Sequence, residues 1–222
     1  MASEVDICNL ALAHLGDNAT VATINPPDGS AQAEHCARFY PMARDALLEM
    51  HTWDFTMSRV PLALLSANAA GWAYTYAAPS NVLNLISILD PAAPDDYSAA
   101  TPPSTWYDPP ILSVGQYTPQ PFQSEIDNTT GADIILTNQV NATLRYSKRV
   151  TDTTKFSPMF VRALTWLLAS ELAGPVVKGE AGAAMAGRCN GVFLKLLAVA
   201  TVSDANNRQI KPPQNVPWMS RR

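Results

Sequence analysis

Histidines, cysteines and acidic residues are the side chains of this sequence that could carry out chemistry. Three histidines (His14, His35, His51) and three cysteines are scattered along the chain, and no C-x-x-C pair occurs. His35 and Cys36 are neighbours, but adjacent residues of a helix point to different faces. They therefore indicate neither a joint metal site nor a thiolate–imidazole pair.

Acidic residues gather in the middle of the chain. They are Asp95, Asp96, Glu125, Asp127 and Asp133. Paired carboxylates can serve hydrolysis or hold Mg²⁺ or Ca²⁺, but solvated loop charges give the same pattern. The segment 127–131 lacks the alternating oxygen ligands of an EF-hand loop. One alternative that stays open is a small hydrolase whose site is assembled from Asp95, Asp127 and His51.

The short motifs of well-known active sites are missing from the sequence. It contains no G-x-S-x-G, G-x-x-x-x-G-K-[ST], G-x-G-x-x-G or H-E-x-x-H. The stretch from Gly174 to Glu180 holds a lysine near a helix start, but it lacks the Gly-Lys-Ser/Thr junction of a phosphate-binding loop, so it predicts an interhelical turn. We expect no catalytic residues, no cofactor and no metal, and hence a protein that is not an enzyme.

Composition is that of a globular protein with unusually little charge. Of 222 residues 47% are hydrophobic and only 15% are charged, which suggests that other chains cover part of the surface. The formal net charge of −4 argues against a general nucleic-acid-binding surface. Cys8, Cys36 and Cys189 lie on apolar helix faces and are expected to be reduced core residues.

A membrane-spanning segment is not expected. Residues 60–89 carry no charge, but Pro61, Gly71 and Pro79 interrupt the run, and its alternation fits strands better. The first ten residues, MASEVDICNL, are acidic and lack the basic region of a signal peptide.

Four helices are predicted from apolar periodicity and caps. Ser3 begins the first, which ends at Gly16 with Val5, Cys8, Leu12 and Leu15 on its apolar face. The second follows Ser30 and contains Pro41, where a kink is expected. Ser157-Pro158 begins the third, which ends near Gly174-Pro175, and the fourth starts near Glu180.

Between the two helix pairs, the spacing of apolar residues changes from the helical period to that of β-strands. The predicted strands are Met57–Leu65, Trp72–Ala77, Val82–Leu89, Phe122–Ile126, Asp133–Thr137 and Asn141–Tyr146. Half of the 18 prolines fall between Pro79 and Pro121, so 91–121 predicts a long projecting loop.

The predicted fold class is α+β. The N- and C-terminal helices form one helical bundle, and an antiparallel β domain is inserted between them. We expect residues 1–54 and 152–205 to make the bundle, residues 55–151 the β-rich insert, and residues 206–222 an extended basic tail.

The tail is the segment whose chemistry stands out. It carries +4 and no acid, which leaves −8 on the rest of the chain. Its prolines keep it extended and its Trp offers an anchor, so we predict a docking arm, with a frayed terminus as the alternative. The predicted partner-binding residues are Arg208, Lys211, Pro212, Pro213, Trp218, Met219, Arg221 and Arg222.

The segment FYPMARDALLEMHTWDF, residues 39–55, predicts a packing hinge at which a helix is followed by a sheet and large rings fill the corner. The order of features around it resembles the head-to-tail adaptor family of tailed bacteriophages, often called tail tubular protein A. The features that carry the resemblance are Leu15-Gly16, the loop from Pro26 to Gly29, the step Phe39-Tyr40-Pro41, and the exit through His51, Trp53 and Phe55. It extends more weakly to Tyr76–Pro79, Val82–Leu89, Phe122–Tyr146 and Phe156–Leu172.

The resemblance implies a structural virion protein with no catalytic residues. Identical subunits would form a ring, expected to be a dodecamer, that is seated on the portal and contacts a tail nozzle or tail tube protein. Double-stranded DNA would pass through its channel, and a wall with net negative charge would not retain it. The expected location is the neck or tail of the virion, and the host cytoplasm during assembly.

Two other classes of protein remain open at this point. One is another tail component, such as a nozzle or baseplate subunit, which would share the low charge and the insert. The other is the small hydrolase described above.

Overall fold

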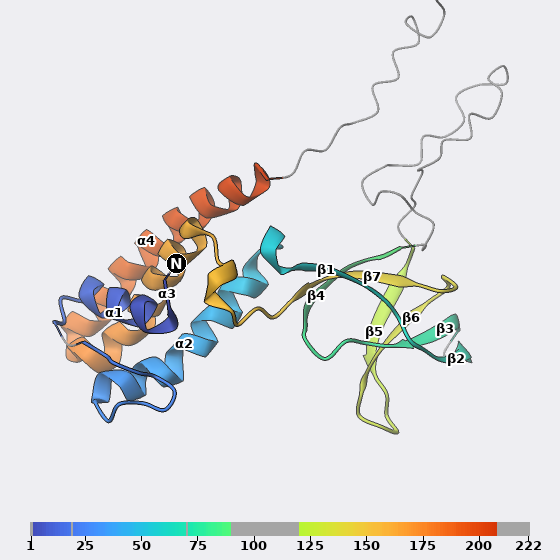
Figure 1. Ribbon diagram of the computed structural model, residues 1–222, viewed down its shortest axis with the longest axis horizontal. Coiled ribbons are helices and arrows are strands. Elements are labelled where there is room, and N and C mark those ends of the chain that lie inside the picture. The colour runs from blue at the N-terminus through green and yellow to red at the C-terminus, as the bar shows by residue number, and fades with distance from the viewer. Residues whose placement is uncertain (1, 19, 70, 90–119, 208–222) are drawn as a thin grey trace, which may run out of the picture. The chain divides into compact units, whose positions relative to one another are not determined.

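The structure, a computed structural model, describes residues 2–18, 20–69, 71–89 and 120–207, and these form two compact units. We call them the helical unit, residues 2–56 with 149–207, and the β unit, residues 57–148. The predicted α+β class is confirmed, because the described residues form four α-helices and two antiparallel sheets (Figure 1). The sequence places the insert at 55–151, and the β unit runs from 57 to 148.

Serine caps begin three of the four helices. The helices are α1 (Glu4–His14), α2 (Ala31–Met50), α3 (Pro158–Val177) and α4 (Gly179–Ala205), with short 3-10 helices at Asp54–Thr56 and Thr153–Lys155. Ser3 and Asp6 form a reciprocal capping box at the start of α1. Ser30 and Ser157 accept hydrogen bonds from the first-turn amides of α2 and α3. The predicted starts of these helices are therefore confirmed.

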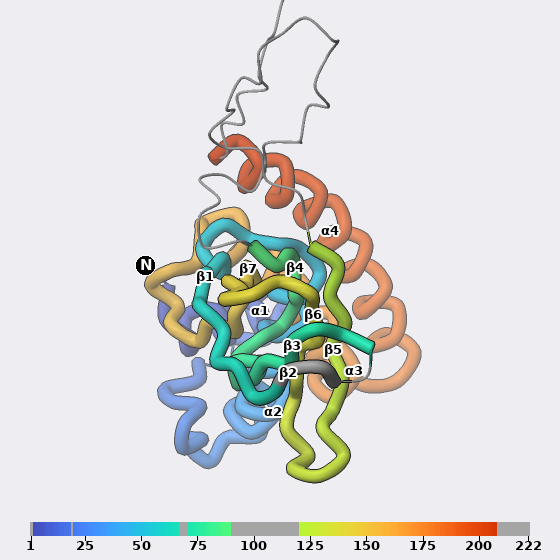
Figure 2. The backbone as a smooth tube through the Cα atoms, turned by 90° about the vertical axis from the view of Figure 1, so that its right-hand side faces the viewer, coloured from blue at the N-terminus to red at the C-terminus, as the bar shows by residue number. Residues whose placement is uncertain are grey.

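Helix α3 is the centre of the helical unit. It packs along α4 on one side and against α1 and α2 on the other (Figures 1 and 2). Its buried residues are Phe160, Ala163, Leu164, Thr165, Leu167, Leu168, Ala169, Leu172 and Ala173. The predicted apolar face of α1 is partly wrong, since Ile7 is buried and Val5 is only half-buried.

A sharp turn joins α3 to α4. Helix α3 does not stop at Gly174-Pro175 as expected but continues to Val177, because a proline in the last turn removes only one hydrogen-bond donor. Lys178 then has φ 63° and ψ 162°, a backbone conformation that is strained for a residue with a side chain. Beyond it, a Cβ placed on Gly182 would lie 2.9 Å from the carbonyl oxygen of Ala173, so the two helices cross closely here.

Two antiparallel sheets make up the β unit. The strands are β1 (Met57–Pro61), β2 (Leu64–Ala69), β3 (Trp72–Ala77), β4 (Val82–Leu89), β5 (Phe122–Ile126), β6 (Asp133–Thr137) and β7 (Thr143–Lys148). One sheet has the order β1-β7-β4 and the other the order β2-β3-β6-β5. Strands β5 and β6 form a hairpin, yellow-green in Figure 2, whose turn Asp127 closes with hydrogen bonds from Thr129 and Thr130.

Two predicted strands differ from the structure. The run 57–65 is two strands, because the chain leaves the first sheet after Pro61 and enters the second at Leu64. The last strand starts at Thr143 rather than Asn141, because Asn141 has φ 50° and belongs to the preceding turn.

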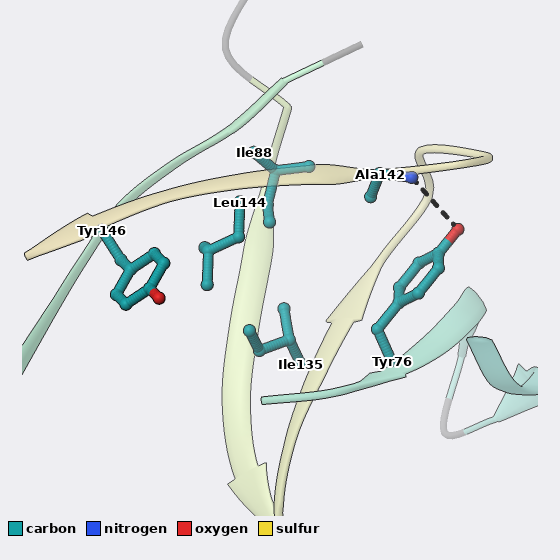
Figure 3. Close-up of a cluster of buried hydrophobic side chains, with 6 residues drawn as sticks. All are labelled: Tyr76, Ile88, Ile135, Ala142, Leu144 and Tyr146. Atoms are coloured by element: carbon teal, nitrogen blue, oxygen red, sulfur yellow. Dashed lines mark hydrogen bonds between the residues drawn. The ribbon is translucent and has the colours of Figure 1, made fainter. Parts of the chain in front are cut away.

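Side chains from both sheets meet in one buried cluster. Tyr76, Ile88, Ile135, Ala142, Leu144 and Tyr146 are its members (Figure 3). The Tyr76 hydroxyl donates to the Gln139 carbonyl at 2.8 Å and accepts from the Ala142 amide at 3.5 Å. Its buried members come from β3, β4, β6, β7 and the residue before β7, so strands of both sheets share one core.

Candidate functional site

The hinge predicted at 39–55 is an aromatic corner of the helical unit. Trp53 is fully buried and donates through Nε1 to the Leu47 carbonyl at 2.9 Å. Its ring meets Phe160 edge-on with centroids 5.1 Å apart, and Phe55 meets Phe160 in the same way. Phe156 completes the cluster at 4.7 Å from Phe160. The corner fixes where α2 ends against α3, and its rings have a packing role.

A buried carboxylate ties the end of α4 to this corner. Asp204, 5% exposed, accepts from the backbone amide of Asp54 at 3.2 and 3.3 Å through its two oxygens. Its Oδ2 also lies 3.4 Å from Nε2 of His51, the C-cap residue of α2. His51 thus lies at a helix end as expected, and the contact joins segments 150 residues apart.

The other histidine and cysteine side chains of this unit make packing contacts. The Cys8 and Cys36 thiols, from α1 and α2, are hydrogen-bonded to each other, and this bond together with burial raises the pKa of Cys8. All three cysteines are free and buried, as expected. The His14 ring stacks on Trp166 of α3 with centroids 3.9 Å apart, and burial lowers the pKa of His14.

The residues of the hydrolase alternative have separate partners. Asp95 lies outside the described residues. The Asp127 carboxylate accepts hydrogen bonds from Thr130 and Thr129 in the β unit, which hold its pKa below the usual range. His51 faces Asp204 in the helical unit. Within the described ranges, no group of three or more His, Cys, Asp or Glu residues could hold a metal ion.

The most unusual surface of the helical unit is on α4. We define the α4 outer face by the exposed residues Ala184, Gly187, Arg188, Gly191, Leu194, Lys195, Ala198, Val199 and Val202. Leu194, Val199 and Val202 are 55, 54 and 63% exposed. Helices α3 and α4 are both long and apolar enough to cross a membrane by length and composition, a test that core helices of soluble proteins also pass.

Exposed apolar side chains also occur on α1 and α2, among exposed charged residues. We define the α1–α2 outer face by the exposed residues Asp6, Leu10, Glu34, Arg38, Met42, Glu49 and Met50. Leu10, Met42 and Met50 are 46, 63 and 53% exposed. Large exposed apolar side chains that recur on a face, rather than singly, are typical of interaction surfaces.

The tail residues predicted to bind a partner, from Arg208 to Arg222, lie outside the described residues, as do residues 91–119 of the loop predicted at 91–121. Sequence reasoning missed the α4 outer face and Asp204. The first could have been noticed, because only Glu180, Arg188, Lys195 and Asp204 are charged in the 27 residues of α4, too few for a solvated face. The role of Asp204 depends on a distant contact and had no local signal.

Comparison with protein-family models and with curated proteins finds no match for this chain.

Proposed function

We propose that this chain is a structural subunit of the virion of a tailed bacteriophage, an adaptor that forms a ring between the portal and the tail. The observation that carries the proposal is the α4 outer face. A long helix exposes Leu194, Val199 and Val202 on a chain with only 15% charged residues. Such a surface suits a subunit that other chains cover in its working state.

The residues that carry the resemblance to the adaptor family also support it. Trp53 and Phe55 belong to a packed corner, and His51 lies at the helix end beside Asp204. These are architectural roles, as a structural protein requires. Both ends of the chain contribute to one helical unit with a β unit inserted between them, which is the organisation that the periodicity of the sequence predicts.

In this proposal the tail is the arm that docks on the portal. Trp218 fills an apolar pocket and contributes on the order of 2–3 kcal/mol to binding. Arg221 and Arg222 meet portal carboxylates and contribute less, because charges at the rim of an interface stay hydrated. The ring also contacts the tail nozzle or tube protein and surrounds the DNA path.

The test is binding of the full chain to the portal protein of the phage whose genome carries this sequence. Sedimentation should show a complex, and negative-stain microscopy should show an added ring on the portal. Trp218→Ala should weaken the complex more than Arg221→Ala with Arg222→Ala, and neither should change the melting temperature of the free chain. If the chain binds neither portal nor tail protein at about 10 µM, the proposal is wrong.

A further inference from the structure

Helix α4 is as apolar as α3, but much less of it is buried within the helical unit. Of its most apolar 18-residue window, 17% is buried, whereas the corresponding value for α3 is 50%. The buried residues of α4 are Gly182, Cys189, Phe193, Ala200 and Asp204, which lie on the side that meets α3. Leu194 and Val202 lie outside this stripe of buried residues and are 55 and 63% exposed.

Small residues of this face leave room for a close neighbour. A Cβ placed on Gly187 or Gly191 would meet nothing within 4 Å. Glycine within a helix is less favourable than alanine, so these two glycines weaken α4 without improving any contact described within the unit. Ala184 and Ala198 are also small, and small side chains on an exposed helix face let a second helix approach closely.

The α1–α2 outer face lies on the other side of the same unit. Helix α3 packs against α4 on one side and against α1 and α2 on the other, so the two outer faces point away from each other (Figure 1). Two different patches on opposite sides of a subunit are what head-to-tail association requires, because each copy uses one patch toward each neighbour.

The charges of the two faces are complementary. On the outward side of α4, the exposed cations Arg188 and Lys195 outnumber the exposed acid Glu180. Among the exposed charged residues of the α1–α2 outer face, Asp6, Glu34 and Glu49 outnumber Arg38. Opposite signs on facing rims favour this pairing and disfavour contact of either face with itself.

We propose that the α4 outer face of one copy packs against the α1–α2 outer face of the next copy, so that this contact builds the ring. The inference rests on the proposed function and names the surfaces through which the subunits meet. Leu194 and Val202 are the apolar centre of the contact on one side, and Leu10 and Met42 on the other. Arg188, Lys195 and the acids of α1 and α2 form its rim.

A lipid surface is the other partner to consider for an apolar helix face. Membrane-bound amphipathic helices present large apolar side chains along the whole buried face. Here Gly187, Gly191 and Ala184 are three of the nine residues of the face, which reduces the area available to lipid and suits a packed helix. The protein partner is therefore favoured, and vesicle binding is an outcome of the test.

Cross-linking between chains tests the pairing directly. Leu194→Cys and Met42→Cys would be made in separate, differently tagged full chains and treated with a short bis-maleimide at about 100 µM. Because native Cys8, Cys36 and Cys189 are buried, the unmodified chain gives the background. The mixed sample should give a product carrying both tags, and the chain with both substitutions should give a ladder of oligomers. The chain with Val140→Cys and Met42→Cys, in which one of the two cysteines is moved to an exposed site of the β unit, is the matched control and should give no ladder.

Charge reversal tests which faces meet. Arg188→Glu with Lys195→Glu should weaken self-association about tenfold, and adding Glu34→Lys with Glu49→Lys should restore most of it. A Leu194→Cys chain that cross-links to itself, absence of any cross-link, or absence of rescue would each overturn the pairing. So would retention of the chain on anionic phospholipid vesicles through Leu194 without self-association.

Failure of this inference can be told from failure of the proposed function. Rings on the portal that form equally well with Leu194→Lys would leave the adaptor function standing and place the subunit contact elsewhere. Head-to-tail oligomers that cross-link as expected but bind neither portal nor tail protein would support the contact and contradict the adaptor function.

Discussion

Helices α3 and α4 follow one another in the chain and are similarly long and apolar, yet their surroundings differ. Helix α3 is enclosed by α1, α2 and α4, and nine of its residues are buried. Helix α4 packs mainly on α3 and buries five of its 27 residues. Apolar residues therefore have two different roles in the helical unit. In α3 they form the core of the subunit. In α4 the apolar side chains that stay exposed are available for contact with another chain.

The comparison predicts that leucine-to-alanine substitutions change stability by very different amounts in the two helices. Leu168→Ala in α3 removes a fully buried side chain and should destabilise the protein by about 2–5 kcal/mol. Leu194→Ala in α4, at a site 55% exposed, should change stability by less than about 0.5 kcal/mol. Urea unfolding of dilute protein measures both. Equal losses would show that Leu194 is packed within the subunit.

Two glycines of α4 allow the buried and the exposed side of this helix to be compared. Gly182→Ala brings a methyl group to 2.9 Å from the Ala173 carbonyl oxygen, and we expect a loss of about 1–3 kcal/mol. Gly191→Ala fills open space and should stabilise the dilute chain by up to about 1 kcal/mol through helix propensity. Thermal unfolding of the two variants should therefore shift in opposite directions. A loss with Gly191→Ala in dilute protein would contradict an open outer face.

The end of α4 is its other firm attachment to the unit. Asp204→Asn weakens the acceptor of the Asp54 amide and removes the charge facing His51, so stability should fall by about 1–2 kcal/mol. Ser203→Ala, at the exposed neighbouring position, is the control and should be neutral. If Asp204→Asn is also neutral, the end of α4 is not held by this contact.

The turn between the two helices should tolerate, and benefit from, glycine. Lys178 has φ 63° and ψ 162°, which glycine adopts without a side-chain clash. Lys178→Gly is expected to stabilise the protein by about 1 kcal/mol, whereas Lys178→Val should destabilise it. The melting temperatures of both variants and of the native chain test this prediction. A lower melting temperature for Lys178→Gly than for the native chain would mean that the turn is not strained.

The smallest expected effect concerns a carboxylate of α3. Burial raises the pKa of Glu171, so its ionised form disfavours the folded state once the pH exceeds the usual value of 4.5. Glu171→Gln should therefore raise the melting temperature slightly at pH 7, and the gain should disappear below about pH 4.5. A gain that persists in acid would assign the effect to something other than ionisation.

The sequence predicts most of the fold because its signals are local. Ser3, Ser30 and Ser157 are caps that act on the next turn, and β3 to β6 are alternating runs bounded by turn residues. The predicted strand boundaries are wrong where a contact between residues distant in the sequence determines the structure. The step from β1 to β2 changes sheets, and no local pattern shows which sheet a strand will join.

The candidate site also has features that the sequence predicts and features that only the folded chain reveals. The aromatic corner is predictable from Trp53 and Phe55, because large rings at a helix end must be buried. The α4 outer face leaves a signal in the sequence, because only four of the 27 residues of α4 are charged, but the sequence does not show that α3 separates α4 from α1 and α2. Asp204 reaches Asp54 across 150 residues of sequence, a pairing that only the folded chain reveals.

The most direct test of the account is the mass of the native chain against its concentration, with Leu194→Lys measured alongside. Sedimentation equilibrium up to about 100 µM should show the native protein rising above its monomer mass of 23.9 kDa, while Leu194→Lys remains monomeric with an unchanged melting temperature. Val140→Lys should behave as the native chain does. A native chain that stays monomeric, or oligomers that Leu194→Lys leaves intact, would contradict the claim that α4 is exposed in order to bind another copy.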